Sequence, residues 1–384
     1  MFHTSLPLLA IVVLSCGDRL SAADKVDSLV AAALKRAGKN RPQLESALTG
    51  VPAGQRDGMR FLIAHMPERD LKVLKADFLI ENVRLAYRAW NESPWKKRVP
   101  KDEFLNNVLP YVSVSERRDN WRKDFRRRFT QIVKDAKTPA AAAALLNRRI
   151  FPLLKVRYSR KRRRADQGPY ESIETGTASC TGLSVLLIDA CRSVGVPARF
   201  VGTPLWADRS GNHSWVEVWD DGWHFTGAAE PTGNVLDRAW FIGRASKARK
   251  DHRLHAIYAV SYKRTPTTFP MVWDRKAKVY AVNVTSRYTR RKNALPDGVV
   301  EVKFRAVSGN GGDRVPAKLR IRDAAGKVVF EGTTHDEGFD GNDHVLVQLR
   351  KNHIYDVRAE YQGKRAATRL KVTTSTPLIT LGLK

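Results

Sequence analysis

The stretch SCTGLSVLLIDACRSVGVPAR, residues 179–199, decides the fold of this chain. Its apolar run Cys180–Val194 predicts a buried helix. Gly195 suits the left-handed position at which many helices end, and residues 197–201 predict a strand directly after it. The stretch therefore predicts a core helix that begins at a cysteine and is followed at once by a strand.

A histidine, His213, lies 33 residues after Cys180 and begins an alternating segment that predicts a strand over 213–219. A thiol in the first turn of a helix sits at the positive end of the helix dipole, which favours the thiolate. The free N–H groups of the same turn can hold an oxyanion. A neighbouring imidazole would accept the thiol proton, and a third polar group would orient the imidazole. We therefore predict Cys180 as a nucleophile and His213 as its base, whereas Cys191, in the apolar part of the helix, should pack in the core.

These residues carry a resemblance to a known family. Cys180-Thr181-Gly182, Gly195-Val196-Pro197-Ala198-Arg199, His213-Ser214-Trp215-Val216-Glu217-Val218 and Gly222-Trp223 together resemble the transglutaminase-like core over roughly residues 120–285. In that family a Cys opens the core helix, a His starts the next long strand, and an Asp in an Asp-Pro-Thr sequence follows on the adjoining strand. The resemblance implies a papain-like α+β fold with Cys180 as nucleophile and His213 as general base and acid.

The third member of the triad departs from the family pattern. Counting from Trp223, the Asp position falls on Gly227, and Glu230-Pro231-Thr232 stands three residues later. With a short insertion or bulge at the strand end, Glu230 could take the role of the Asp, and we predict it as the third triad residue. Asp237 is a weaker alternative. We interpret Asp220 and Asp221 as turn residues, and His224, beside Trp223 on the second strand of the hairpin, is not expected to act as a base.

Other residues are candidates for shaping the site. Gln167 and Tyr170 precede the nucleophile helix and could donate to the oxyanion, while Trp206 lies on the loop that leads to His213. No metal or other cofactor is predicted, because His252-x-x-His255 lacks both a zinc-protease glutamate and a third ligand, and no calcium loop of the EF-hand type is present.

The chain divides into five segments by pattern. Residues 1–23 predict a secretory signal peptide, with an apolar core at 6–14 and small residues before a cut after Ala23. Lipidation at Cys16 is the alternative, and either way the mature protein should leave the cytoplasm. A helical region is expected over 24–115, the catalytic core over 116–285, a polar linker over 286–296 and a β-sandwich over 297–384.

Within these segments, the spacing predicts a helix over Asn120–Lys137 and another that starts at Thr138-Pro139 and stops before Pro152. Short alternating runs at 299–307, 317–323, 328–333, 344–349, 354–361 and 369–372 predict a small Ig-like sandwich. Because this last segment contains no cysteine and no cluster of catalytic type, we interpret it as a binding or spacer module.

Composition excludes several classes of protein. With 9 Trp, 10 Tyr and 14 Phe the chain is not a disordered coil, and 3 cysteines do not make a disulfide scaffold. No apolar run approaches a transmembrane span. The net charge of +29 predicts attraction to an acidic protein or peptide substrate, or to a polyanionic surface, and a surface adapted to its medium is the alternative interpretation. The knot Arg160–Arg164 has no nucleic-acid motif around it, and a solvated loop is the alternative interpretation.

Together these patterns predict an extracytoplasmic thiol enzyme that acts on peptide or amide bonds through a thioester, with water as the acceptor. Two alternatives stay open at this point. An amine acceptor would make the protein a crosslinking transglutaminase, and loss of the third triad residue would leave a non-catalytic scaffold or binding protein.

Overall fold

The computed structural model describes residues 22–289, 296–309, 311–373 and 378–384. The predicted signal peptide, apart from its last two residues, lies outside these ranges, as do Cys16 and most of the predicted linker. No helix within the described residues is both long and apolar enough to cross a membrane.

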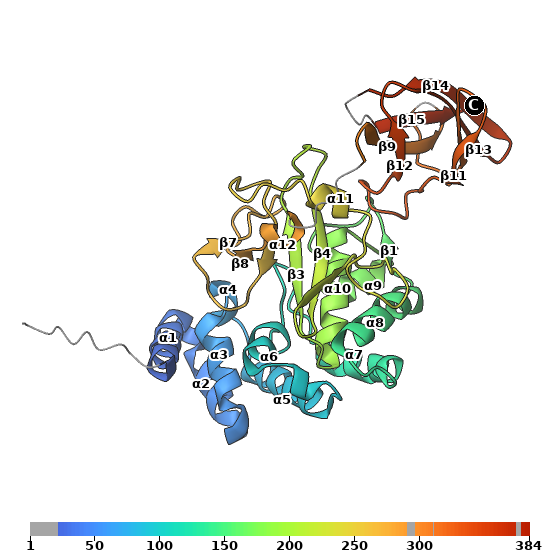
Figure 1. Cartoon of the computed structure of the whole chain (residues 1–384). Coiled ribbons are helices and arrows are strands. Elements are labelled where there is room, and N and C mark those ends of the chain that lie inside the picture. The colour runs from blue at the N-terminus through green and yellow to red at the C-terminus, as the bar shows by residue number, and fades with distance from the viewer. Residues whose placement is uncertain (1–21, 290–295, 310, 374–377) are drawn as a thin grey trace, which may run out of the picture.

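The predicted α+β class is confirmed, and helices form the first part of the chain (Figure 1). The longest of them, α5, has a strongly amphipathic pattern, and its Leu79, Val83 and Ala86 are fully buried. The helices in this region are α1 (Ala22–Ala37), α2 (Arg41–Gly50), α3 (Arg56–His65), α4 (Glu68–Leu71), α5 (Ala76–Glu92) and α6 (Lys101–Asn107).

A six-stranded antiparallel sheet and the helix α10 (Cys180–Ser193) form the centre of the segment 116–285, for which the sequence predicts the catalytic core and which is called the catalytic segment below. The strand order is β5-β4-β3-β6-β8-β7, and α10 packs against β3 and β4, with its residues from Thr181 to Ser193 all buried. Further helices are α7 (Arg122–Phe129), α8 (Pro139–Leu154), α9 (Pro169–Thr175), α11 (Ile242–Ala245) and α12 (Thr285–Thr289), and the strands are β3 (Ala198–Thr203), β4 (His213–Trp219), β5 (Trp223–Thr226), β6 (Tyr258–Val260), β7 (Thr267–Thr268) and β8 (Tyr280–Asn283).

Two helix boundaries differ from the sequence prediction. The helix expected over Asn120–Lys137 is α7, which changes to a 3-10 turn at Thr130, where the Thr130 hydroxyl donates to the carbonyl of Arg126. Helix α8 starts at Pro139 with Thr138 as its cap, as predicted, but it continues through Pro152 to Leu154. A proline so close to the end removes only one helical hydrogen bond, and Lys155 then ends the helix in the left-handed conformation.

The predicted β-sandwich is present, and its described residues form seven strands in two sheets. One sheet has the order β11-β10-β13-β14 and the other β12-β9-β15, and their facing side chains form a core of their own. Strand β14 is longer than the predicted 369–372, and β15, which pairs in parallel with β9, was not predicted. The strands are β9 (Val299–Ser308), β10 (Lys318–Asp323), β11 (Val328–Thr333), β12 (Val345–Arg350), β13 (Ile354–Tyr361), β14 (Lys364–Lys371) and β15 (Leu378–Leu383).

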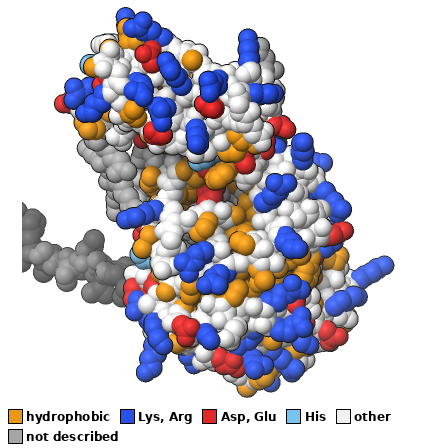
Figure 2. Space-filling view, turned by 90° about the vertical axis from the view of Figure 1, so that its right-hand side faces the viewer, with side chains coloured by type: hydrophobic (Ala, Val, Ile, Leu, Met, Phe, Trp, Pro, Cys, Tyr) orange, Lys and Arg blue, Asp and Glu red, His pale blue; other side chains and the backbone are white. Residues whose placement is uncertain are grey.

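The sandwich forms a separate lobe that touches the catalytic segment mainly through a loop (Figure 1). This loop, residues 334–344 between β11 and β12, reaches back to the start of β4, where the Asn342 amide donates to the carbonyl of Asn212 at 3.4 Å. A second contact joins Lys303 Nζ to Asp208 Oδ2 at 3.1 Å. Figure 2 shows Lys and Arg side chains over the visible face of both lobes and a hollow where the lobes meet.

Candidate active site

Cys180 is the first residue of α10, and its position is fixed by the residues on either side. The Ser179 hydroxyl caps the helix by accepting the N–H of Gly182 at 3.1 Å. The Thr181 hydroxyl lies 3.1 Å from the Ser214 hydroxyl and so joins the first turn of α10 to β4 beside His213. Cys180 itself remains partly exposed, whereas Cys191, as predicted, is fully buried in the core.

His213 is the first residue of β4 and is only 1% exposed. Aromatic rings surround its imidazole, with Trp240 and Phe241 at centroid distances of 4.8 and 4.9 Å and Trp206 and Trp215 at 6.1 and 5.9 Å. Packing on four rings fixes the plane of the imidazole without using either of its nitrogens, and neither nitrogen has a hydrogen-bond partner among the described residues.

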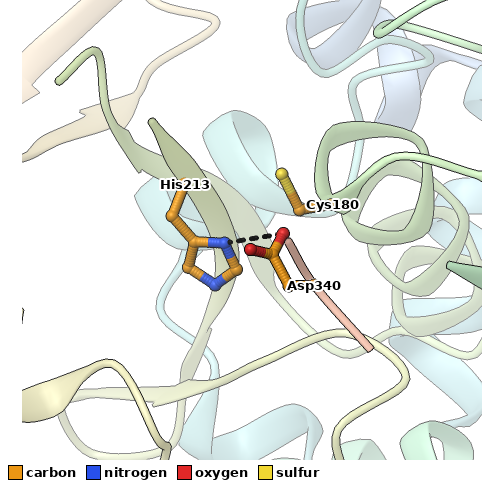
Figure 3. Close-up of side chains that lie close together, drawn as sticks. All are labelled: Cys180, His213 and Asp340. Atoms are coloured by element: carbon orange, nitrogen blue, oxygen red, sulfur yellow. Dashed lines mark ion pairs between the residues drawn. The ribbon is translucent and has the colours of Figure 1, made fainter. Parts of the chain in front are cut away.

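The third group beside this pair is Asp340, which comes from the loop of the β-sandwich (Figure 3). One atom each of Cys180, His213 and Asp340 lie within 4.8 Å of one another, and Asp340 Oδ2 is 3.5 Å from His213 Nδ1. No residue of the sandwich was placed at the site from the sequence. Asp340 was missed because it lies 127 residues after His213, and its sequence DEGFDGND is typical of a polar turn.

The loop holds Asp340 firmly. The buried Arg314 guanidinium donates to the carbonyls of Phe339, Asp340 and Asp343 at 2.6, 3.0 and 3.1 Å. The N–H of Asn342 donates to Asp340 Oδ1 at 2.9 Å. Asp340 is only 4% exposed, and hydrogen bonds within the β-sandwich lobe hold it beside His213.

The charges of the site support one another. Burial lowers the pKa of His213, but the Asp340 carboxylate and Cys180 raise it, and the net shift is well above the usual range. Burial raises the pKa of Asp340, yet His213 and the hydrogen bonds from Asn342 lower it by more. The structure thus favours an imidazolium–carboxylate pair at neutral pH.

The orientation of the ring decides what this pair can do. Figure 3 shows Nδ1 directed toward Asp340, with Cys180 beside that carboxyl group, while Nε2 lies on the far side of the ring. In a catalytic triad the base uses one nitrogen for the nucleophile and the other for the orienting acid. Here Asp340 and Cys180 approach the same nitrogen, so Asp340 competes with Cys180 instead of supporting it.

Glu230, the predicted third residue, lies nearby with a buried carboxyl group. Burial raises its pKa to about 7, while the charge of His213 lowers it and that of Asp340 raises it further. A Cβ placed on Gly227 would lie 1.9 Å from Glu230 Oε2. The Glu230 carboxyl group therefore occupies the space of a side chain at position 227, which is where the family pattern expects its Asp. Asn147 of α8 holds this turn by donating to the carbonyl of Gly227 at 2.8 Å.

The remaining predicted residues lie around the site in other roles. The amide of Gln167 donates to Thr175 and Thr177, and the Tyr170 ring packs on Phe125, so neither lines the cavity over Cys180. Trp206 is buried against the His213 ring. Asp237 pairs with His224 at 2.8 Å, and Arg98 pairs with Asp220 and Asp221 in the hairpin turn.

A cavity of about 210 Å³ opens over Cys180 and contains two donors that the sequence did not indicate. Tyr158 of β1 (Arg157–Tyr158) lines it, and burial together with Asp340 and Cys180 raises the pKa of its hydroxyl. Trp273 lines it as well, and its buried indole N–H has no partner among the described residues. A protonated phenol and a free indole N–H beside a thiol are suited to an oxyanion. Neither residue belongs to a recognisable motif.

The same three side chains are a candidate metal-ligand set. The ligand atoms of Cys180, His213 and Asp340 lie close enough together for one ion. Sulfur, imidazole nitrogen and carboxylate oxygen are ligands that zinc accepts. A metal bound there would occupy the thiol and the imidazole together. Metal binding at these three residues would therefore inhibit the thiol chemistry of Cys180 and His213.

Part of this chain matches a family of known proteins. Residues 126–227 match the model of the Transglutaminase-like superfamily, so the chain contains a transglutaminase-like domain. A search of curated proteins found no match.

Three solved structures are similar to this chain in part. S.CueP is 15% identical, with a TM-score of 0.19, over 28% of this chain and 67% of that chain. A protein from Cytophaga hutchinsonii with a provisional cysteine-protease assignment is 13% identical, with a TM-score of 0.28, over 49% and 68%. Red sea bream transglutaminase is 9% identical, with a TM-score of 0.27, over 76% and 58%. All three scores are low, so the domain assignment rests on the family match.

Proposed function

We propose that this chain is a thiol hydrolase that cleaves peptide or amide bonds through a thioester on Cys180. The observation that carries the proposal is the placement of Cys180 at the N-terminus of α10 with the His213 ring beside it, inside a transglutaminase-like domain. The apolar residues 6–14 and the small residues before position 24 support an extracytoplasmic location for this activity.

The chemistry needs two steps. In the first, Cys180 Sγ forms a bond to the carbonyl carbon, and His213 takes the thiol proton and gives it to the leaving amine. The N–H groups of the first turn of α10, the Tyr158 hydroxyl and the Trp273 indole N–H hold the oxygen that becomes negative. In the second, water adds to the thioester, His213 takes its proton and returns it to sulfur, and a carboxylic acid leaves.

We assign the two carboxyl groups to different states of the enzyme. Glu230 is the orienting acid, supported by its place beside Gly227 and its Coulombic interaction with His213. Asp340 closes the resting site, because it takes the ring nitrogen that faces Cys180. When the loop withdraws, the pKa of Glu230 falls, since Asp340 raises it, and the ionised Glu230 can then support the imidazolium.

The test is turnover of peptide mixtures in oxygen-18 water, with and without an added primary amine. Hydrolysis inserts one heavy oxygen at the new carboxyl group, whereas a crosslinking enzyme joins the amine to the peptide. The Cys180→Ala variant should do neither. If wild type and variant are equally inactive while both retain the same binding partner, the protein is a scaffold and the proposal fails.

A further inference from the structure

A second hollow lies beside the cavity over Cys180, between the two lobes. It has a volume of about 470 Å³ and is lined by residues 157–161 of the catalytic segment and by strand and loop residues of the β-sandwich. Tyr158 belongs to the walls of both hollows, so the groove lies next to the cavity over Cys180. A peptide whose reacting carbonyl lies at Cys180 would extend into it.

The five basic residues 160–164 fall into two groups, one paired with carboxylates and one that lines the two hollows. Arg163 and Arg164 point back to α9, where they pair with Glu174 at 3.7 Å and Glu171 at 2.7 Å. In the described part of the chain, no ion pair involves the three preceding basic residues, and these line the groove and the cavity. They are Arg160 and Lys161 in the groove and Arg162 in the cavity.

The opposite wall adds cations from the other lobe. Arg305 of β9 donates to the Thr380 hydroxyl at 2.9 Å and has no carboxylate partner among the described residues. Two carboxylates also line the groove, but Glu337 is paired with the buried Arg314 at 3.4 Å, which leaves Asp313. The free charge of the groove is therefore positive and comes from both lobes.

The chain itself shows that a carboxylate fits this cleft. Asp340 reaches the catalytic pair from an acidic loop, and its neighbour Gly341 lies against the wall formed by residues 157–161: a Cβ there would lie 3.4 Å from Tyr158 Oη and 3.8 Å from Arg160 Cδ. An acidic segment thus already lies along the cationic residues, and a substrate that enters must replace it.

We propose that the groove binds an acidic segment of the peptide substrate, next to the bond that Cys180 attacks, and that this segment displaces the loop carrying Asp340. The inference rests on the proposed function for the position of the reacting bond. The binding preference itself follows from the unpaired cations at residues 160–162 and 305 and does not require turnover.

The experiment measures fluorescence anisotropy of three labelled peptides on the full-length Cys180→Ala protein. One peptide is rich in Asp and Glu, the second has Asn and Gln in their places, and the third has Lys. We expect the acidic peptide to bind at least tenfold more tightly than the neutral one at low salt, with the difference shrinking as salt rises. The double change Arg160→Glu with Lys161→Glu, and separately Arg305→Gln, should each reduce the preference.

The matched control is Lys35→Glu with Lys39→Glu, the same charge change on the exposed part of the N-terminal helices, which should leave the preference intact. Equal binding of acidic and neutral peptides, or an equal loss in the control, would overturn the inference. Because the measurement uses a protein without the thiol, a preference for the acidic peptide with an inactive wild type would defeat the proposed function alone.

Discussion

The catalytic segment and the β-sandwich hold their parts of the site by different means. Cys180 and His213 stand on a helix and a strand that pack on each other and are joined by the Thr181–Ser214 contact. Asp340 stands on a loop that is ordered within its own lobe by Arg314 and meets the catalytic segment through few bonds. The packing of helix on strand is suited to a fixed reacting pair, and the loop is suited to a group that can move away from the site.

The largest effect should come from the fixed pair. Cys180→Ala removes the nucleophile, and we expect peptide hydrolysis to fall by at least about 10⁴-fold. Cys191→Ala, in the buried part of the same helix, should keep turnover within about twofold and cost about 1 kcal/mol of stability, because it leaves only a small cavity. Turnover rates and urea denaturation curves of both variants distinguish a loss of activity from a loss of stability. Similar turnover rates for Cys180→Ala and Cys191→Ala would exclude Cys180 as the nucleophile.

Glu230→Gln should reduce kcat/KM by about 100-fold at pH 8 and little at pH 5. This ratio reports the free enzyme, in which the Glu230 carboxyl group, with its pKa raised to about 7, is already neutral at pH 5. A pH–rate profile measures this difference. An equal loss of activity at pH 5 and pH 8 would contradict the assignment of Glu230 as the orienting acid. Gly227→Ala is a second variant, since its Cβ would meet Glu230 Oε2 and push the carboxyl group aside.

Glu230→Gln, which should lower activity, should raise the stability of the protein at high pH. The folded state keeps the Glu230 proton up to about pH 7 while a free glutamate loses it at 4.5, so the wild type loses stability as pH rises between these values. The difference corresponds to about 3 kcal/mol. Glu230→Gln should therefore raise the free energy of unfolding at pH 8 and leave it nearly unchanged at pH 4.

Asp340→Asn keeps the shape of the loop but removes the charge that pairs with His213. We expect kcat/KM for a small neutral peptide to rise by about three- to tenfold at pH 7, since a tenfold gain needs only about 1.4 kcal/mol. His213 has a raised pKa and Asp340 a lowered one, so the pair exists between these two values and is lost as pH rises through that of His213. The advantage of the variant should disappear there. A loss of activity would instead make Asp340 the orienting acid.

The smallest effect concerns metals. Removal of divalent ions with EDTA should leave hydrolysis unchanged, because no step uses a metal. Added zinc should inhibit reversibly by taking the thiol, His213 and Asp340 as ligands, and Asp340→Asn should weaken that inhibition. If EDTA abolished the activity and calcium restored it, the enzyme would require calcium, which would contradict the metal-free mechanism.

How much of this the sequence predicts depends on how local each cause is. The helix at Cys180, the strand at His213 and the sandwich strands follow from periodicity and turn residues close in the chain. The carboxylate at His213 Nδ1 could not be predicted, because its place depends on how one lobe docks on the other. Tyr158 and Trp273 were missed for a different reason, because a two-residue strand and an irregular loop bring them to the cavity only in the folded protein.

The most direct test of a catalytic pair closed by Asp340 is the rate at which iodoacetamide alkylates Cys180 in wild type, Asp340→Asn and Glu230→Gln at pH 6, with Cys191 as the internal reference. The account predicts that Cys180 reacts and Cys191 does not, and that Asp340→Asn raises the rate of Cys180 severalfold while Glu230→Gln does not. A rate that Asp340→Asn leaves unchanged or lowers would contradict it.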